Sequence, residues 1–306
     1  TKRENANQTL HQLINTGSID KFVLHSPNYN KNNKYGIAVL VISSAKEVDL
    51  RREIREQWAT AKASKSLETG NALVIFLVGR SPDLNSESAM NGDILQIDIE
   101  ETYRNMVYKI ETGFLWLNRH VDFEFLAKID SDTVVHIDRL YPTLKYFEKK
   151  SNNFLVCTSV WGGAPYRNEG DQWYTSYLDY PGRRYPRFCR GAGYVMSRIA
   201  FEKIMERIGK HHIIEGEDVF FTGIVAERVV DKVYNDGVVA TQYTRYSDCN
   251  ANGPVQSILC THDQFSDSHH RKDISAAWKQ LQNPICNSGA LVFPSFKLLL
   301  NVIMIL

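Results

Sequence analysis

The chain has 306 residues, of which 43% are hydrophobic and 23% are charged. This balance is typical of a folded globular protein and excludes disorder along most of the chain. The 36 lysines and arginines nearly cancel the 35 aspartates and glutamates, so no global field attracts nucleic acid or an anionic membrane. We therefore expect no nucleic-acid partner, and any anionic ligand must be held by local groups.

Strand and helix patterns alternate in the first half of the core, which begins at Tyr35 after a polar lead-in over residues 1–34. Apolar runs of strand length indicate buried strands, and apolar residues every three or four positions indicate helices. The predicted order is strand 35–43, a helix within 45–61, strand 72–79, strand 93–99, helix 102–117 and strand 123–130. This alternation predicts an α/β fold with a mostly parallel central sheet flanked by helices.

The second half, from about residue 154, is richer in Tyr, Trp, Gly and Pro and is less regular. It predicts aromatic loops, a helix near 198–208, another starting near Asp218, and short strands around 233–246 and 254–261. Because no repeat or linker separates the halves, we expect one domain over residues 35–286, with a first half (35–150) and a second half (151–286).

The apolar stretch 290–306 is shorter than a normal membrane span and is interrupted by Pro294, Lys297 and Asn301. We expect it to pack on the domain, with a membrane-associated tail as the alternative. The sequence does not show the role of this C-terminal tail, residues 287–306.

The cysteines carry limited information. They show neither a CxxC pair nor the Cys/His spacing of a zinc site, and the sequon at Asn7 fits a secretory chain in which disulfides persist. Their odd number leaves at least one thiol outside any intrachain disulfide, and the pairing cannot be read from the sequence. They are Cys157, Cys189, Cys249, Cys260 and Cys286.

Two carboxylates, Asp130 and Asp132, follow the buried strand FEFLA. Charges at the edge of a core need neutralising, and a hard divalent cation prefers carboxylate oxygen. In parallel sheets, ligands bind where strands end. The alternative is a pair of acids that cap a turn.

A phosphatase of the haloacid-dehalogenase type is a competing interpretation, with Asp130 as nucleophile and Asp132 as acid/base. In that family the loop follows the first strand, whereas three predicted strands precede Asp130 here.

A second acidic cluster, EGEDVFFTG (215–223), runs into an apolar helix. Acids at a helix N-terminus are favoured by the dipole, so Asp218 is either a cap or a general base. His262 ends a short apolar run and could complete a cation site begun by carboxylates, although a lone histidine is more often structural.

Arginines and aromatic residues supply further candidates. Arg51, Arg52 and Arg55 could reach a phosphate or nucleobase, or pair with neighbouring Glu53 and Glu56 on a solvated face. A group of aromatic residues lies among Gly and Pro, which predicts loops in which exposed rings can stack on the faces of sugars. The alternative is that these rings belong to the core. The members of this group are Trp161, Trp173, Tyr174 and Tyr180. Gly191-Ala192-Gly193 lets a backbone approach a ligand closely, or turns a corner.

Taken in order, these segments resemble the β-1,3-glycosyltransferases of glycosyltransferase family 31, the β-1,3-galactosyl- and N-acetylglucosaminyltransferases. The resemblance spans roughly residues 36–282, and several segments in register are more specific than any one. The matching segments are RREIREQW (51–58), FLVG (76–79), GDILQIDIEETYRNMVYKI (92–110), FLAKIDSDTVV (125–135), YPRFCRGAGYVMS (185–197) and EGEDVFFTG (215–223).

The resemblance implies a GT-A (Rossmann-like) fold and an inverting transfer from a UDP-sugar to a glycan on a glycolipid or glycoprotein, assisted by Mn²⁺. It also implies a type II Golgi membrane protein with a lumenal catalytic domain, whose anchor precedes residue 1 and whose stem is residues 1–34. The implied roles are Mn²⁺ ligation by Asp130, Asp132 and His262, general-base catalysis by Asp218, a place beside the nucleotide pocket for Arg51, Arg55 and Trp58, and a glycine turn near the donor sugar at Gly191 and Gly193.

One departure is that the family's usual triple Asp is Asp-Ser-Asp here, which preserves the outer pair. A sugar-binding relative that has lost turnover is a further alternative. The donor sugar (galactose, N-acetylglucosamine or N-acetylgalactosamine) is not predicted by the sequence.

Overall fold

The computed structural model describes residues 19–160, 162–234, 237–240, 246–247, 249–250, 253–261, 273–283 and 285–286. Of the predicted features, Trp161, His262, the sequon at Asn7 and the tail 287–306 lie outside these ranges.

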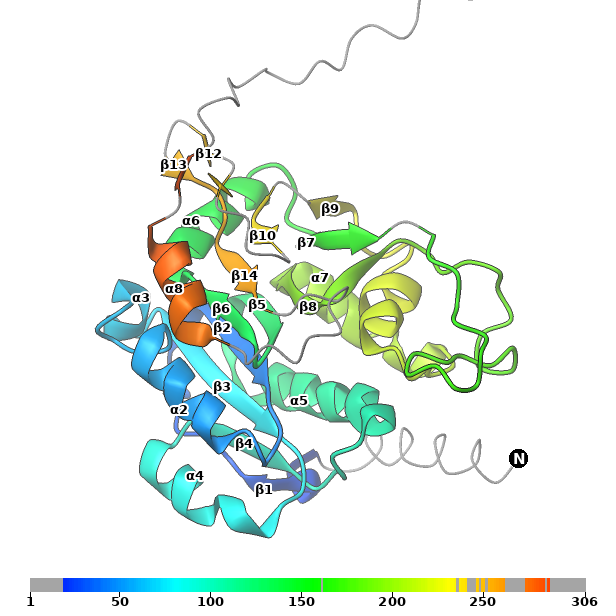
Figure 1. Ribbon diagram of the computed structural model, residues 1–306, viewed down its shortest axis with the longest axis horizontal. Helices are drawn as coiled ribbons and strands as arrows, with labels where there is room; N and C mark the ends of the chain where they lie inside the picture. The colour runs from blue at the N-terminus through cyan, green and yellow to red at the C-terminus, as the bar shows by residue number, and fades with distance from the viewer. Residues whose placement is uncertain are drawn as a thin grey trace, which may run out of the picture.

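An eight-stranded sheet forms the centre of the molecule (Figure 1). Its inner strands β4, β3, β2 and β5 pair in parallel, β1 and β8 pair antiparallel with their neighbours β4 and β5, and β9 pairs in parallel with β7 at the far edge. The spatial order is β1 (Val23–His25), β4 (Ile94–Ile97), β3 (Ala72–Val78), β2 (Lys34–Ile42), β5 (Asp122–Asp130), β8 (Phe188–Ser197), β7 (Phe154–Val160) and β9 (Lys232–Tyr234).

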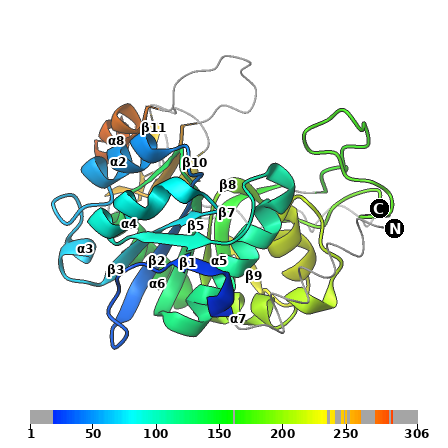
Figure 2. The ribbon, with the colours of Figure 1, turned by 90° about the horizontal axis from the view of Figure 1, so that it is seen from below.

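Helices cover both faces of this sheet, and alternation along the strands explains why. In β2, Ala38, Leu40 and Ile42 face one core cluster, which includes residues of α5 and α7. The intervening Ile37, Val39 and Val41 face the other cluster, with residues of α2, α6 and α8. Figure 2 shows α8 beside α2, although they are far apart in the chain. The helices are α2 (Val48–Gln57), α3 (Lys65–Glu68), α4 (Asn85–Asn91), α5 (Met106–His120), α6 (Ile137–Glu148), α7 (Arg198–Met205) and α8 (Ile274–Gln282), with 3₁₀ turns η1 (Ile19–Phe22), η2 (Pro82–Leu84), η3 (Tyr103–Asn105) and η4 (Ile208–Lys210), and the π-helix η5 (Val219–Val225).

Smaller sheets extend the second half. One has the order β10 (Val239–Ala240), β14 (Ile258–Cys260) and β6 (Thr133–Val135), while β11 (Tyr246–Ser247) pairs with β15 (Ile285–Cys286) and β12 (Cys249–Asn250) with β13 (Gly253–Pro254). Disulfides join Cys157 to Cys189 and Cys249 to Cys286. Cys260, the fifth cysteine, is buried and outside both disulfides.

The predicted α/β fold with a mostly parallel central sheet flanked by helices is confirmed. The fold extends further toward the N-terminus than the expected start at Tyr35, because Ile19 is buried and β1 pairs with β4. Within the described ranges, no helix combines the length and the apolar character needed to cross a bilayer.

Candidate active site

Asp130 and Asp132 lie where β5 ends and the chain turns into β6. Asp130 is the last residue of β5, and its side chain is 41% exposed. Asp132 is only 9% exposed, and the amide and hydroxyl of Thr261 donate to its carbonyl oxygen at 2.9 and 2.8 Å. The predicted position of both acids at the carboxyl end of a parallel strand is confirmed.

Asp130 and Asp132 provide oxygen donors of the kind that Mn²⁺ or Mg²⁺ prefers. In the part of the chain that the structure describes, no group of three His, Cys, Asp or Glu side chains is arranged to hold a metal. The third predicted ligand, His262, lies outside that part. The two carboxylates therefore fit a hard divalent cation in kind, as an incomplete set.

The serine between the two acids has a specific partner. The Ser131 hydroxyl donates to Glu47 Oε2 at 3.1 Å, and the same oxygen accepts from the Ser43 hydroxyl and the Ser44 amide. An aspartate at position 131 would place a second carboxylate against Glu47. The Asp-Ser-Asp departure from a triple Asp is thus matched to this neighbour.

The side chains of Arg51 and Arg55 are bonded to carboxylates of other elements. Arg51 is fully buried and donates to both oxygens of Glu87 at 2.8 and 2.6 Å. Arg55 forms a bidentate pair with Asp93 at 2.7 and 2.8 Å and also contacts Glu87. For Arg51 and Arg55 the alternative of a solvated face paired with Glu53 and Glu56 is wrong, because their partners lie more than 30 residues away along the chain. Arg52 does lie on a solvated face, where it pairs with Asp49.

These pairs fix helix α2 against α4 and the start of β4. Arg51 also donates to the Ser43 hydroxyl at 2.9 Å, and Ser43 in turn bonds to Glu47. Trp58 is fully buried beside them, and its indole nitrogen has no hydrogen-bond partner among the described residues. Arg51 therefore reaches the Asp-Ser-Asp turn only through intermediate side chains.

Lys128 joins the two acidic motifs. Its side chain is 2% exposed, and its ammonium donates to Asp130 Oδ1 at 2.9 Å, to Glu217 Oε1 at 2.7 Å and to the Gly191 carbonyl at 2.7 Å. Burial opposes the charged form, but the two carboxylates outweigh it and raise the pKa of Lys128 above its ordinary value. All three ammonium donors are used, so Lys128 fixes the end of β5 relative to β8 and to the acidic cluster before η5.

Glu217 is the buried acid of this network. It is 8% exposed, and its second carboxylate oxygen accepts from the Tyr194 hydroxyl at 3.1 Å. Burial raises the pKa of Glu217 to about 7, with Lys128 acting in the opposite direction and Asp218 adding to the rise. Glu217 and Asp218 therefore differ in their contacts: Glu217 is bonded to Lys128 and Tyr194, while Asp218 Oδ1 accepts from the Val219 amide.

Asp218 caps the π-helix η5. Its Oδ1 accepts from the Val219 amide at 2.8 Å, as the capping interpretation predicts, and Asp218 also lines a cavity. Burial raises the pKa of Asp218, while the Val219 amide and Lys128 lower it. π-Helices are rare and are frequently found at functional sites. A cap and a general base are therefore compatible assignments for this one carboxylate.

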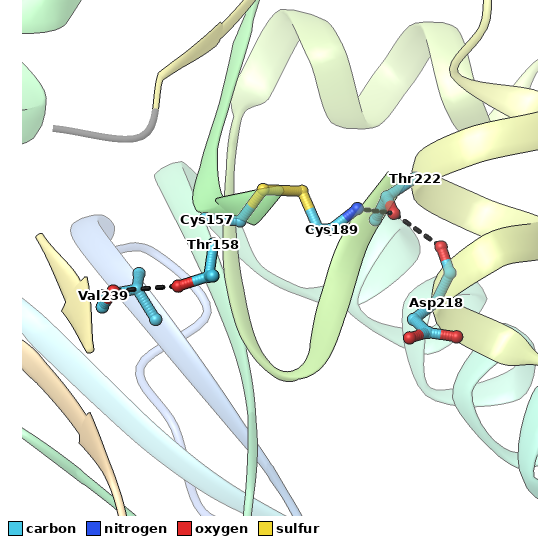
Figure 3. Close-up of a disulfide and its surroundings, with 6 residues drawn as sticks. All are labelled: Cys157, Thr158, Cys189, Asp218, Thr222 and Val239. Atoms are coloured by element: carbon cyan, nitrogen blue, oxygen red, sulfur yellow. Dashed lines mark hydrogen bonds between the residues drawn. A yellow bond between two sulfur atoms is a disulfide. The ribbon is translucent and has the colours of Figure 1, made fainter. Parts of the chain in front are cut away.

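A disulfide supports the backbone at Asp218 (Figure 3). The Cys157–Cys189 bond joins β7 to β8. The Cys189 amide donates to the Thr222 hydroxyl at 2.8 Å, and that hydroxyl donates to the Asp218 carbonyl at 2.5 Å. The first turn of η5 is thus anchored to the disulfide-bonded part of the sheet.

Gly191 and Gly193 lie inside strand β8, so the expected glycine turn is wrong. A Cβ atom at Gly191 would lie 3.5 Å from Asp218 Oδ2 and 3.5 Å from Glu217 Oε1. These are ordinary van der Waals distances, so the acidic cluster lies directly against the backbone of β8 at Gly191.

A cavity of about 370 Å³ opens beside Asp218. Aromatic side chains dominate its wall, and Tyr166 and Trp173 stand 51% and 46% exposed with ring centroids 5.5 Å apart. The polar side chains among its lining residues include Arg190, Glu215, Thr175 and Asp218. Neither Asp130 nor Asp132 lines this cavity. Of the three predicted site acids Asp130, Asp132 and Asp218, Asp218 is thus the one in the wall of this aromatic cavity.

Most of the aromatic wall comes from the loop between β7 and β8, the green segment that extends beyond these strands in Figure 1. Arg167 holds the loop together by donating to four carbonyl oxygens at 2.7–2.8 Å, those of Thr175, Ser176, Tyr180 and Gly182. The expectation that Trp173, Tyr174 and Tyr180 lie in a loop is confirmed. Tyr180 does not line the cavity, and its hydroxyl donates to the Arg184 carbonyl.

Sequence reasoning did not identify Lys128, Tyr194 or Arg190, and it treated Glu217 only as a neighbour of Asp218. Lys128 had a usable signal, because a lysine inside an otherwise apolar buried strand needs a carboxylate partner. Arg190 gave no comparable signal, since its position in the cavity depends on how the loop folds.

Comparison with known proteins identifies the family to which the chain belongs. The family model described as "Galactosyltransferase" matches residues 49–236, and the chain belongs to this galactosyltransferase family. The match favours the glycosyltransferase prediction over the phosphatase alternative.

The chain is similar to individual β-1,3-galactosyltransferases. It is 29% identical over 286 residues to beta-1,3-galactosyltransferase 2 of Mus musculus, which covers 88% of this chain and 64% of that protein. The Homo sapiens protein of the same name is 28% identical with the same coverage. Beta-1,3-galactosyltransferase 1 of Mus musculus is 29% identical over 215 residues, 68% of this chain and 64% of that protein. The matched region thus spans just under two thirds of each relative.

Among solved structures, the glycosyltransferase GlyE of Streptococcus pneumoniae TIGR4 aligns with a TM-score of 0.42 and 11% identity, covering 81% of this chain and 60% of that one. This similarity is too low to support an argument about function.

Proposed function

We propose that the chain is an inverting glycosyltransferase. It moves a hexose or N-acetylhexosamine from a UDP-sugar to the 3-hydroxyl of an acceptor glycan and forms a β-1,3 linkage with the assistance of Mn²⁺. Family membership supports sugar transfer. The observation that carries the proposal is the position of Asp218, a carboxylate of raised pKa in the wall of an aromatic cavity.

Asp218 is the proposed general base. An inverting transfer requires a base that takes the proton from the attacking hydroxyl. Its raised pKa makes Asp218 a stronger base than an exposed aspartate, and Oδ1 is held by the Val219 amide. The neighbouring rings of Tyr166 and Trp173 offer apolar faces on which an acceptor sugar stacks.

Asp130, Asp132 and His262 are the proposed ligands of Mn²⁺. When bound there, the cation would supply charge neutralisation for the departing diphosphate. Lys128 holds Asp130 by one carboxylate oxygen. We propose that Arg51, Arg55 and Trp58 support the nucleotide pocket by fixing α2, since both guanidinium groups are bonded to carboxylates.

Two variants test these assignments: Asp132→Ala tests the proposed metal ligand, and Asp218→Asn tests the proposed base. Release of UDP from a panel of UDP-sugars, with and without Mn²⁺ and acceptor, is measured by coupled assay. We expect each variant to lose about 10²- to 10⁴-fold in transfer rate with an unchanged unfolding temperature.

Asp49→Asn is a matched control, because the Asp49 side chain is 86% exposed and its pair with Arg52 lies at the surface. Near-normal turnover in Asp218→Asn would remove Asp218 as the base. UDP release from no donor in the panel would support the non-catalytic alternative.

We further propose that the chain works in the Golgi lumen, anchored to the membrane by a segment upstream of residue 1, on a glycolipid or glycoprotein acceptor. The two disulfides support an oxidising compartment. Immunofluorescence of the full-length protein with a Golgi marker tests the location, and a cytosolic distribution would contradict it.

A further inference from the structure

We propose that Arg190 makes the cavity beside Asp218 specific for an acceptor that carries a carboxylate, such as a glycan ending in a uronic or sialic acid. The inference rests on the proposed glycosyltransferase function and adds the class of its acceptor.

Arg190 is the guanidinium group in the cavity wall, on strand β8 next to Gly191. It is half-buried, and among the described residues no hydrogen bond, ion pair or ring contact involves its side chain. The other arginines near this site are committed: Arg167 to four carbonyls and Arg104 to Glu215 at 3.4 Å. A half-buried guanidinium with all its donors available is suited to a planar anion.

The two acids in the cavity wall do not occupy the guanidinium of Arg190, so it stays available to a ligand. Glu215 lies against Arg104, and Asp218 Oδ1 is held by the Val219 amide. The lining carries one cation, Arg190, and two carboxylates, and Arg104 beside Glu215 offsets part of their charge, so the guanidinium of Arg190 is the cavity group that can receive an incoming carboxylate.

The location separates an acceptor group from the donor phosphates. The cavity is lined by Asp218 but by neither Asp130 nor Asp132, the residues proposed to lie at the diphosphate. Its aromatic wall, with Tyr166 and Trp173, suits a sugar face. A sugar ring on the aromatic wall, a hydroxyl at Asp218 and a carboxylate at Arg190 together define an acidic glycan.

Binding can be measured without turnover, so the test is independent of the proposed reaction. Isothermal titration calorimetry compares two disaccharides that differ only in their terminal sugar, a hexuronic acid or the corresponding hexose. For the unmodified protein we expect the acidic ligand to bind about tenfold or more tightly. In Arg190→Gln that preference should disappear, while affinity for the neutral ligand stays within about twofold.

Arg183→Gln is the matched control, since Arg183 is exposed in the same loop and does not line the cavity. Unfolding temperatures of the variants check that they fold. Equal binding of the two disaccharides by the unmodified protein, or a preference that survives in Arg190→Gln, would overturn the inference.

Kinetics with a UDP-sugar separate this inference from the proposed function. A rise in KM for the donor alone in Arg190→Gln would assign Arg190 to the diphosphate and overturn the acceptor role. Complete absence of UDP-sugar turnover in the unmodified protein, with the acidic preference in binding intact, would contradict the proposed function and leave the carboxylate site standing.

Discussion

Replacing Lys128 by methionine tests the link between the two acidic motifs. Methionine retains much of the length and apolar bulk of the lysine side chain but removes the ammonium, which bonds to Asp130, Glu217 and Gly191. Only Glu217 is left as a buried uncompensated charge, because the Asp130 side chain is 41% exposed and screened by solvent. Breaking a buried pair from one side costs about 3–5 kcal/mol of unfolding free energy.

The cost should depend on pH, since Glu217 can escape by taking up a proton. At pH 8, protonating a carboxyl whose ordinary pKa is 4.5 costs at most about 5 kcal/mol. Glu217 of the unmodified protein, with its pKa raised to about 7, already carries most of this cost, so its charge adds at most about 1.4 kcal/mol in the variant. At pH 5 protonation costs little, and the loss reduces to the hydrogen bonds of the ammonium, about 1–3 kcal/mol. We therefore expect Lys128→Met to destabilise the fold by about 2–4 kcal/mol at pH 8, the sum of the charge contribution and the lost hydrogen bonds, and by about 1–3 kcal/mol at pH 5.

Urea denaturation at both pH values, followed by circular dichroism, measures these free energies. In the double variant Lys128→Met with Glu217→Gln, the buried carboxylate is gone, so stability at pH 8 should exceed that of Lys128→Met alone. An equal loss at pH 5 and pH 8, with no recovery in the double variant, would refute the electrostatic reasoning and leave a packing defect as the cause.

Three further changes probe the surroundings. Ser131→Asp should lower the unfolding free energy by about 1–3 kcal/mol, because it sets a carboxylate against Glu47 Oε2. Adding Glu47→Gln to the same chain should restore most of this loss. Thermal unfolding measures both changes, and no recovery in the double variant would contradict the assigned contact. Thr222→Val removes the hydroxyl between Cys189 and Asp218, so the rate of transfer should fall with the donor KM unchanged in steady-state kinetics; an unchanged rate would show that the link is only structural. Since the pKa of Glu217 is raised from 4.5 to about 7, the folded state holds this proton between those pH values and the unfolded state does not, so stability should decline as pH rises through that window, by up to about 1.4 kcal/mol per pH unit. Urea midpoints at pH 5, 6 and 7 should show a flatter decline in Glu217→Gln, and an unchanged slope would exclude Glu217 as its source.

The strands of the parallel half were predictable because both faces are covered, which makes them continuous apolar runs. Residues 35–43 and 123–130 are β2 and β5 within one residue at each end. Strand β1 was not predicted, because it has three residues, none of them fully buried, and its place is decided by the edge of β4. Short edge strands carry little pattern of their own.

The positions of the candidate acids were predictable where they follow a strand or begin a helix. Asp130 and Asp218 were identified from such positions, whereas the partners of Arg51 and Arg55 were not, since Glu87 and Asp93 lie on separate elements and are brought near only by tertiary packing. The cavity combines η3, the loop before β8 and the turn before η5. No local pattern specifies that combination.

Strand β8 links two acidic motifs that lie 88 residues apart in the chain, at Asp130 and Asp218. On one side the Gly191 carbonyl accepts from Lys128, which holds Asp130. On the other, the Cys189 amide anchors Thr222 and thereby the carbonyl of Asp218. Between these contacts Gly191 has no side chain, and the carboxylates of Glu217 and Asp218 lie within ordinary van der Waals reach of the Cβ position. The backbone of β8 thus connects the turn that carries Asp130 to the start of η5 that carries Asp218, through Lys128 on one side and Thr222 on the other.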